Sequence, residues 1–209
     1  MDPFAGALRS DADLVALYGE AAPRSWRKDV GMLDAAACAL VAAAPMVLVA
    51  SHDADGRCDV TPRGGPPGFV AVLDEHHLAI PDATGNKRLD TLRNVVATGR
   101  AGLLFLIPGR DQTLRVNGRA CVTADPDVLA AAGAVGKPPT TAIVVAADEV
   151  YAHCPKAFIR SRLWDPEAWP PLDGLPTASE VMLAHLRDPD RTLAEEEQHL
   201  ADALKHRLA

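Results

Sequence analysis

Three cationic side chains lie near the ends of predicted elements, where they could hold one phosphate group. Arg63 closes a predicted strand, and Lys87 and Arg88 open a predicted helix. Arg and Lys form charge-assisted hydrogen bonds with a phosphate monoester, and the free amides of a helix N-terminus add a favourable dipole. Adjacent cations in a first helical turn can equally be solvated and bind nothing. The pattern therefore predicts a site for one doubly charged anion, with solvated surface cations as the alternative.

Other glycine-rich or basic segments do not form nucleotide-binding or hydrolase motifs. Residues 133–137 resemble a phosphate-binding loop, but the spacing is too short and Pro138 stands where a Ser or Thr would bind magnesium. Residues 64–68 lack the spacing of a dinucleotide-binding loop. The sequence also has no Gly-x-Ser-x-Gly elbow, so a serine hydrolase is not indicated.

The elements that would position the three cations follow a hairpin pattern. An apolar run at 46–50, turn residues at 52–56 and an extended stretch at 58–61 before Pro62 predict two antiparallel strands. Further strands are predicted at 69–73, 78–80, 101–107, 112–122 and 140–151. The strand at 101–107 is almost continuously apolar, which predicts burial on both faces. The strand at 112–122 alternates in polarity and should have one polar face.

Helices are predicted between and around these strands. Residues 86–96 carry apolar side chains at helical intervals and should form a short helix within the sheet region. Other helices are predicted from Ser10 onward, at 34–44 and at 155–162, with Ser10 and Asp13 placed to cap the first. Residues 165–176 are rich in Pro and predict an extended surface arm. Two capping boxes follow the arm, Thr177 with Glu180 and Thr192 with Glu195. The leucine stripe of the last helix should pack on the parent domain or on a partner subunit.

Bulk properties indicate one main domain. The chain has 209 residues, 48% hydrophobic content, a formal net charge of −7 and a pI near 5.4. This charge argues against nucleic-acid binding, and no apolar run is long enough to span a membrane, so a cytoplasmic protein is expected. We expect one split-barrel domain over 1–209, with a core at about 45–154, N-terminal helices at 10–44 and a C-terminal arm and helices at 155–209.

The cysteines and histidines do not form a recognisable metal motif. None of the four cysteines belongs to a Cys-x-x-Cys pair, and they are too sparse for a disulfide scaffold. Buried free thiols are therefore the preferred interpretation. The seven histidines lack the paired spacings of a zinc site, so no metal is expected.

An ordered set of motifs between Ser51 and Val122 resembles the pyridoxamine 5'-phosphate oxidase-like, FMN-binding split-barrel family. The set comprises Arg63 at a strand end, Asn86-Lys87-Arg88, the apolar strand 101–107 and the run Gln112-x-x-Arg115-Val116-x-Gly118. Residues 61–64, 154–157 and 159–164 are similar to a bacterial subgroup of probable FMN-dependent proteins whose substrates are largely unassigned.

The resemblance implies an α+β fold that is mainly β, an antiparallel split β-barrel with flanking helices, and FMN as the cofactor. It implies a homodimer with the flavin site at the subunit interface. By this resemblance Arg63, Lys87 and Arg88 bind the FMN phosphate. Asn86 and the backbone around Thr61 and Asp82 would bond the ribityl chain or the ring. Gln112 would approach the ring edge, with a turn-end amide facing water as the alternative. Arg115 would serve the flavin or the dimer interface, and a strand-face Arg is also commonly an ion-pair partner. The second subunit would supply Lys156, Arg160 and Trp164, with an ordinary core or interface anchor as the alternative for Trp164.

One departure from the family pattern bears on the substrate. Pyridoxamine phosphate oxidases resemble one another at a C-terminal Arg-x-His signature, and residues 160–164 contain no His. Oxidation of vitamin B6 is therefore not the favoured activity, and no catalytic residue is assigned. Three classes stay open: an FMN-dependent oxidoreductase for an unassigned small organic substrate, a flavin- or deazaflavin-binding module without robust turnover, and a protein that binds haem or another small ligand on the same barrel.

Overall fold

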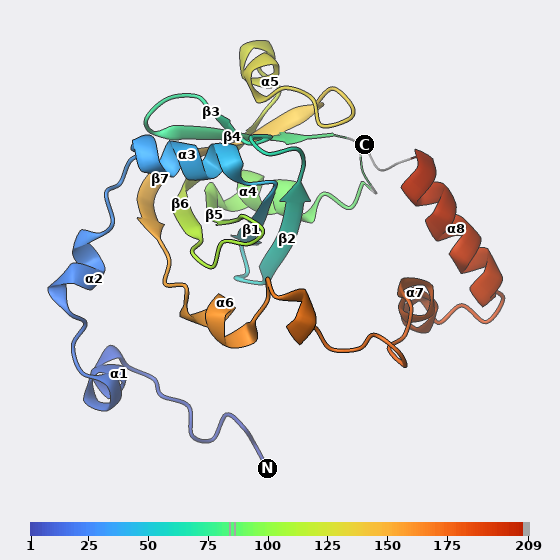
Figure 1. The fold of residues 1–209 in the computed structure, drawn as a ribbon, viewed down its shortest axis with the longest axis horizontal. Coiled ribbons are helices and arrows are strands. Elements are labelled where there is room, and N and C mark those ends of the chain that lie inside the picture. The colour runs from blue at the N-terminus through green and yellow to red at the C-terminus, as the bar shows by residue number, and fades with distance from the viewer. Residues whose placement is uncertain (84, 86, 207–209) are drawn as a thin grey trace.

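The computed structural model describes residues 1–83, 85 and 87–206, and its centre is one antiparallel β-sheet (Figure 1). The strand order is β2-β1-β5-β6-β7-β4-β3, and all neighbouring strands are antiparallel. The strands are β1 (Met46–His52), β2 (Cys58–Gly64), β3 (Ala71–Val72), β4 (His77–Asp82), β5 (Arg100–Leu106), β6 (Leu114–Thr123) and β7 (Thr141–Ala152). Strand β3 is shorter than the predicted 69–73: Phe69 and Val70 are buried but precede it, and Leu73 follows it.

Helices flank this sheet, so the predicted α+β class is confirmed. They are α1 (Asp11–Tyr18), α2 (Pro23–Arg27), α3 (Ala35–Ala43), α4 (Asp90–Thr98), α5 (Pro126–Ala132), α6 (Lys156–Ser161), η1 (Pro166–Ala168), α7 (Ala178–Leu186) and α8 (Leu193–His206). Helix α5 is not among the predicted elements; Asp125 caps it by accepting from the amides of Asp127 and Val128. None of the described helices is both long and apolar enough to cross a lipid bilayer.

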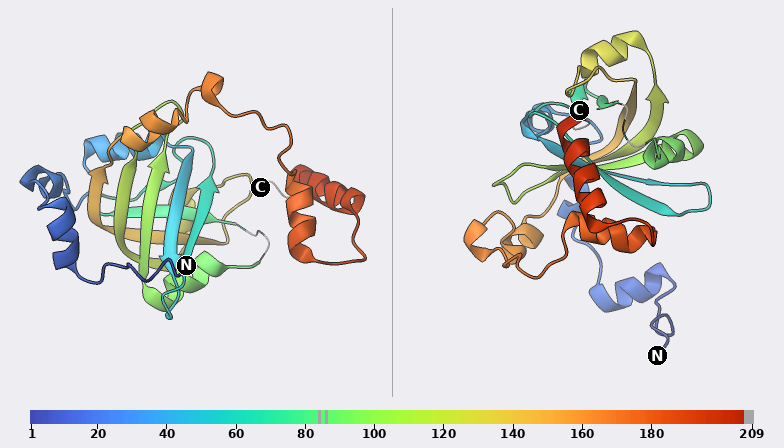
Figure 2. Two further views of the ribbon diagram at one scale, coloured as in Figure 1. Left: turned by 90° about the horizontal axis from the view of Figure 1, so that it is seen from below. Right: turned by 90° about the vertical axis from the view of Figure 1, so that its right-hand side faces the viewer.

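The sheet is rolled so that its two ends meet. Strand β2 begins the strand order and β4 is next to its other end, yet Arg63 Nη2 of β2 lies 3.2 Å from Asp82 Oδ2 of β4. This ion pair therefore crosses the open seam of a split barrel, whose curl is visible in Figure 2.

The barrel core is formed by alternate residues of the central strands. Val47 and Val49 of β1, Leu103 and Phe105 of β5, and Leu114 and Val116 of β6 are all at most 3% exposed. The expectation that 101–107 is buried on both faces is wrong, because Gly102, Leu104 and Leu106 alternate with the buried residues and are half-buried on the outer face. A continuous run of apolar residues does not reveal that only one face of this strand is fully buried in the protein core.

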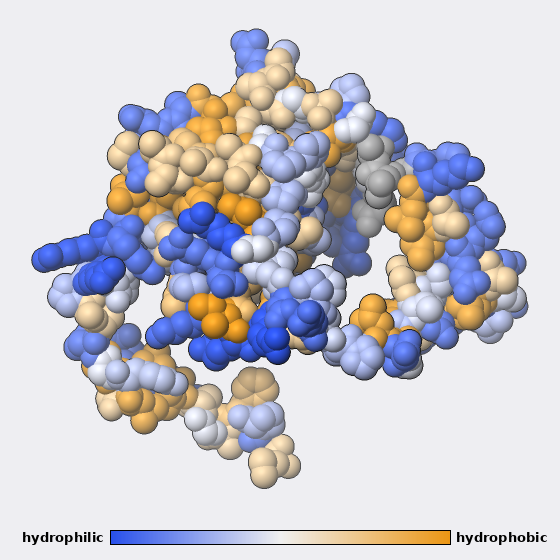
Figure 3. Space-filling view, viewed as in Figure 1, coloured by the Kyte–Doolittle hydropathy of each residue, from blue (hydrophilic) through white to orange (hydrophobic). Residues whose placement is uncertain are grey.

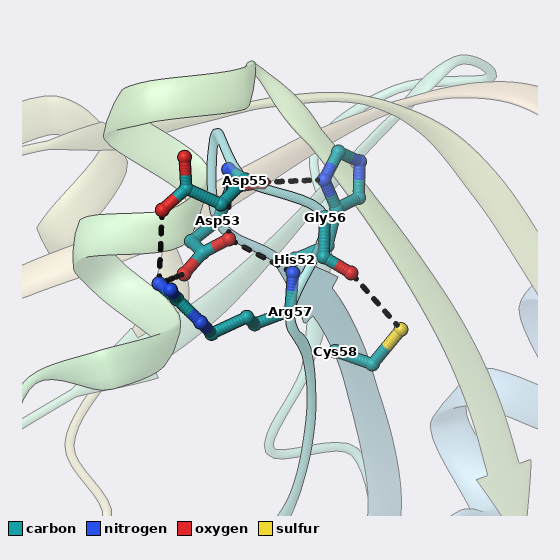
Figure 4. Close-up of polar contacts among 6 residues, drawn as sticks. All are labelled: His52, Asp53, Asp55, Gly56, Arg57 and Cys58. Carbon is teal, nitrogen blue, oxygen red and sulfur yellow. Dashed lines mark hydrogen bonds and ion pairs between the residues drawn. The ribbon is translucent and has the colours of Figure 1, made fainter.

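The turn between β1 and β2 sets the register that places Arg63 (Figure 4). The Asp53 carboxylate accepts hydrogen bonds from the backbone amides of Asp55 and Arg57, each at 2.9 Å. Gly56 adopts a left-handed φ of 82°, which a glycine accepts at little cost. The resulting register pairs Arg63 with the fully buried Val47, so Arg63 faces the inner side of the sheet.

Helix α4 begins later than the sequence predicts. Leu89 has a left-handed φ of 61°, and the first helical hydrogen bond runs from the Arg93 amide to the Leu89 carbonyl. Lys87 is also left-handed, at φ 62°. Lys87 and Arg88 therefore precede the helix and do not form its first turn, because left-handed residues cannot continue a right-handed helix.

The cysteines are free but not buried as predicted. Cys58, Cys121 and Cys154 are exposed, and Cys38 is half-buried. Cys58 stands at the start of β2 beside the exposed turn of Figure 4, and Cys121 is at an exposed position of β6. An exposed position tolerates a side chain as small as that of cysteine. The residue type alone therefore does not reveal that these cysteines are exposed.

The terminal segments extend from opposite sides of the barrel (Figure 2). All three predicted helix caps form, with Ser10, Thr177 and Thr192 each receiving the amide three residues later. Helix α8 packs against α7, where the buried Glu196 accepts from Arg191 at 2.8 Å. Figure 3 shows the hydrophobic side chains of this hairpin on the side that faces the barrel. Of the leucine stripe, Leu193 and Leu204 are exposed and Leu200 is half-buried, whereas Leu208 lies outside the described residues, so its packing on the parent domain or on a partner stays a prediction.

Candidate functional site

The seam of the barrel holds a guanidinium with unused hydrogen-bonding capacity. Arg63 is 27% exposed and its partner Asp82 is 16% exposed at the side chain. The Nε atom of Arg63 is buried and has no hydrogen-bond partner among the described residues. A buried donor without an acceptor costs roughly 1–3 kcal/mol. An acceptor brought to Nε would recover that cost, so the seam fits an oxyanion.

The carboxylate beside Arg63 is itself in an unfavourable environment. Burial raises the pKa of Asp82, and the positive charge of Arg63 offsets only part of this effect. Arg63 therefore compensates only part of the cost of burying the Asp82 carboxylate. An anion with more negative charge would compete with Asp82 for Arg63.

A buried polar network fixes α4 on the hairpin that carries Arg63. Thr91 of α4 donates to Asp59 Oδ2 at 2.9 Å, and its Oγ1 lies 2.9 Å from Thr61 Oγ1. Asn94 Nδ2 donates to Ser51 Oγ at 3.0 Å. Thr91 and Asn94 are at most 9% exposed. Thr61 is among the site residues predicted from the sequence, whereas Ser51, Asp59, Thr91 and Asn94 are not. Thr91 and Asn94 could have been recognised as two polar residues on the apolar face of the predicted helix.

The backbone at the start of α4 also offers hydrogen-bond donors. No side chain caps this helix, and Leu89 is left-handed while Asp90 is helical. Successive amides in such an alternation form a concave anion-binding nest. Arg88 is exposed and makes a close ion pair with Asp90, and Lys87 is exposed. Asn86 lies outside the described residues.

Gln112 and Trp164, one of the predicted C-terminal site residues, meet at the turn between β5 and β6. Trp164 Nε1 donates to the Arg110 carbonyl at 3.0 Å, and Arg110 donates to Gln112 Oε1 at 3.1 Å. The Trp164 ring stacks on Phe158 of α6 at 5.7 Å. Lys156 and Arg160 are exposed on the same helix. Gln112 and Trp164 are therefore bonded to the β5–β6 turn of their own chain, whereas Arg63 is bonded to Asp82 at the seam.

Arg115 faces the opposite side of the sheet from Arg63. It neighbours the fully buried Val116 in β6, and it donates to the Tyr151 hydroxyl at 2.9 Å on the outer face. The structure therefore does not bring Arg115 to the Arg63 seam of the same chain.

Comparison with known proteins identifies the family. A model of the family described as pyridoxamine 5'-phosphate oxidase matches residues 33–154, which is more than half of the chain. The chain belongs to the pyridoxamine 5'-phosphate oxidase family. The family resemblance predicted from the sequence motifs is thereby confirmed. The matched region contains the whole sheet and the Arg63 seam.

Solved structures with related folds are more distant. HupZ from Group A Streptococcus is 18% identical, with a TM-score of 0.45 over 55% of this chain and 88% of that chain. A putative pyridoxamine 5'-phosphate oxidase from Lactobacillus delbrueckii is 23% identical, with a TM-score of 0.46 over 59% and 98%. The FAD binding protein from Mycobacterium smegmatis is 17% identical, with a TM-score of 0.41 over 58% and 95%. No curated protein matches the sequence.

Proposed function

We propose that this family member binds FMN with its phosphate at the barrel seam and acts as an oxidoreductase on a small organic substrate. The observation that carries the proposal is the buried Arg63 Nε, which lacks an acceptor in the part of the chain that the structure describes. Family membership supports a flavin as the ligand that supplies one. FMN fits this position because its phosphate monoester accepts several charge-assisted hydrogen bonds at once.

Each residue of the seam has a distinct part in the proposed binding. Arg63 would donate from Nε to a phosphate oxygen, and the amides at the start of α4 would donate to others. Lys87 and Arg88 would add positive charge from the loop before α4. Asn86 and the backbone near Thr61 and Asp82 would bond the ribityl chain or the ring. The network around Thr91 would hold the α4 amides and Arg63 in register.

The bound flavin would supply hydride chemistry, and the chain would position the reactants. We assign no general base to the chain. Because residues 160–164 contain no His, the substrate is proposed to be a small organic molecule other than a vitamin B6 phosphate.

We further propose that the protein is a homodimer with the flavin at the interface. Gln112 and Trp164 gather at the β5–β6 turn, and Lys156 and Arg160 are exposed on α6, whose Phe158 stacks on Trp164. These residues are not bonded to the Arg63 seam of their own chain, so they are free to complete the site of a partner. Arg115 would then face the interface side of the sheet.

Comparison of FMN with riboflavin tests the phosphate site directly. The Arg63→Gln variant loses one charge-assisted contact, worth about 1.5–3 kcal/mol. It should therefore bind FMN about 10- to 100-fold more weakly than the parent protein. Riboflavin has no phosphate, so its affinity should change little. Arg57→Gln is the matched control, since Arg57 is an exposed arginine of the same hairpin. Equal FMN affinity in Arg63→Gln and the parent protein would refute the phosphate site.

Turnover needs a separate test. The absorption spectrum of the purified protein should show flavin bands, and a nicotinamide donor under anaerobic conditions should bleach them. Bound flavin that no physiological donor reduces would favour the binding-module alternative.

A further inference from the structure

A cavity lies on the outer face of the sheet, at the turn end of the β1–β2 hairpin. Its volume is about 470 Å³, within the range of small-molecule pockets. The lining residues are Ala50, Ser51, His52, Cys58, Arg100, Ala101, Gly102, Asn117, Gly118, Asp148 and Glu149. Ala50 pairs with Gly102, and Gly102 pairs with Asn117. The small side chains in this row of outward-facing residues leave the hollow.

The acidic side chains of the cavity already have partners. Arg100 Nη1 donates to Asp148 at 2.8 Å, and Arg119 lies 3.7 Å from the same carboxylate. Asn117 Nδ2 donates to Glu149 at 2.7 Å. The cavity therefore combines a floor of small residues with a polar rim in which Asp148 is paired with arginines and Glu149 is hydrogen-bonded to a neutral amide.

A cationic cluster lies one row along the same face. Arg115 and Tyr151 are each two residues from a cavity residue of their own strand, a step of about 6.6 Å. Arg115 Cζ is 5.6 Å and Lys28 Nζ is 4.6 Å from the Tyr151 ring centre. Neither cation forms an ion pair with a carboxylate in the described part of the chain. Two positive charges thus share one aromatic ring without a counter-charge.

The neighbouring histidine responds to this excess charge. Burial lowers the pKa of His153, and the positive charges of Arg115 and Lys28 lower it further. The His153 ring lies 5.8 Å from the Tyr151 ring. An anion at the cluster would offset both charges, so His153 is an internal reporter of anion binding.

We propose that this outer face binds a small organic anion, with a body of about one ring in the cavity and a carboxylate or phosphate group at Arg115 and Lys28. The site is separate from the proposed FMN phosphate site, because Arg63 faces the inner side of the sheet. Arg115 belongs to both proposals, because it also faces the proposed dimer interface, so the two are distinguished at Ala50 and not at Arg115.

Nuclear magnetic resonance of the full-length protein, with and without FMN, tests the proposal. The probes are benzoate and phenyl phosphate, with benzamide as the uncharged control. Both anions should shift the His153 ring signals in a saturable way and raise the pKa of His153, whereas benzamide should not. The His153→Gln spectrum assigns the signals among the seven histidines.

Two variants separate the body of the ligand from its charge. Ala50→Leu fills the cavity and should weaken benzoate binding at least tenfold while inorganic phosphate still shifts His153. Arg115→Gln should abolish both responses. Ala39→Leu on the exposed side of α3 is the control for added bulk. FMN affinity should be unchanged in Ala50→Leu, so failure here and failure of the flavin proposal are distinguishable.

Three outcomes would overturn the proposal. Benzamide could shift His153 as strongly as benzoate, which would remove the role of charge. FMN could compete with benzoate, which would make the cavity part of the flavin site. Protein dilution, and not the probes, could move the signals, which would mean that a second copy covers this face.

Discussion

Arg63 stands between two anions, its own Asp82 and the proposed phosphate. Their ion pair is 3.2 Å long and largely buried, and burial raises the pKa of Asp82. A phosphate bound at Nε would therefore share the guanidinium charge with Asp82, which is bonded at Nη2. The affinity for FMN reports the balance between the two.

Asp82→Asn should strengthen FMN binding. The substitution removes the negative charge that competes for Arg63. A gain of about one hydrogen bond, roughly 1 kcal/mol, corresponds to roughly fivefold tighter FMN binding. Fluorescence titration of FMN measures the change. Asp74→Asn, at an exposed turn before β4, is the control and should leave the affinity unaltered. Weaker binding by Asp82→Asn would mean that the carboxylate itself contacts the flavin.

His153 should contribute a pH dependence to stability. Its folded pKa lies below the ordinary 6.5, so the unfolded chain binds more protons in the window just below that value. The free energy of unfolding should therefore rise with pH through this window. Urea denaturation between pH 5 and 7.5 (about the range set by the usual His pKa) should show this slope in the parent protein. His153→Gln should lose it, whereas the exposed His76→Gln should keep it.

At the scale of elements, local patterns predict the strands better than the site loop. The alternation of polarity along β6 correctly predicts that Leu114 and Val116 lie inside, because a strand has a side-chain period of two. The predicted start of α4 is wrong because the left-handed Lys87 and Leu89 have ordinary helix-compatible side chains. Their left-handed conformation depends on how the chain must run from β4 at the seam to α4, and this three-dimensional constraint is not visible in a short stretch of sequence.

The Thr91 network should be an important source of stability for α4. Thr91→Val removes a donor to Asp59 from a side chain that is 2% exposed, which should cost about 1–3 kcal/mol. Thr98→Val is the matched control, because Thr98 bonds only the carbonyl of its own helix at Asn94. The midpoint of urea unfolding measures both. Equal losses in the two variants would show that the network contributes nothing specific.

The bulge between Asn117 and Gly118 needs a residue without a side chain. A Cβ at Gly118 would lie 1.8 Å from the Ala146 carbonyl oxygen, which is backbone and cannot move aside. Gly118→Ala should destabilise the sheet by at least about 2–3 kcal/mol. Gly102→Ala on the adjacent strand closely approaches the end of the Asn117 side chain, at 3.0 Å, and makes an ordinary contact with Ala50 at 3.8 Å, so it should be tolerated. Thermal unfolding distinguishes the pair, and equal stability of both variants would contradict this account.

At the scale of the molecule, the barrel carries two projecting segments with exposed apolar side chains. Trp26 is 74% exposed on the N-terminal side, and Leu172 and Leu175 are at least 61% exposed on the C-terminal arm. Figures 1 and 2 show both segments extending away from the barrel. Partial burial of such side chains by a second copy would stabilise the proposed dimer through the hydrophobic effect.

A mixed-subunit experiment decides whether each flavin site combines two chains. Arg63→Gln and Arg160→Gln should each weaken FMN binding when present in both subunits. In a heterodimer of the two variants, one site carries both changes and the other carries neither, so one FMN per dimer should bind with parent affinity. A heterodimer of Arg63→Gln with Lys87→Gln is the control: both residues are proposed to serve the phosphate from the same chain, so each site keeps one lesion and no binding should be restored. If the first heterodimer also fails to recover binding, Arg63 and Arg160 do not meet across the interface, and the α6 residues must act within their own chain or not at all.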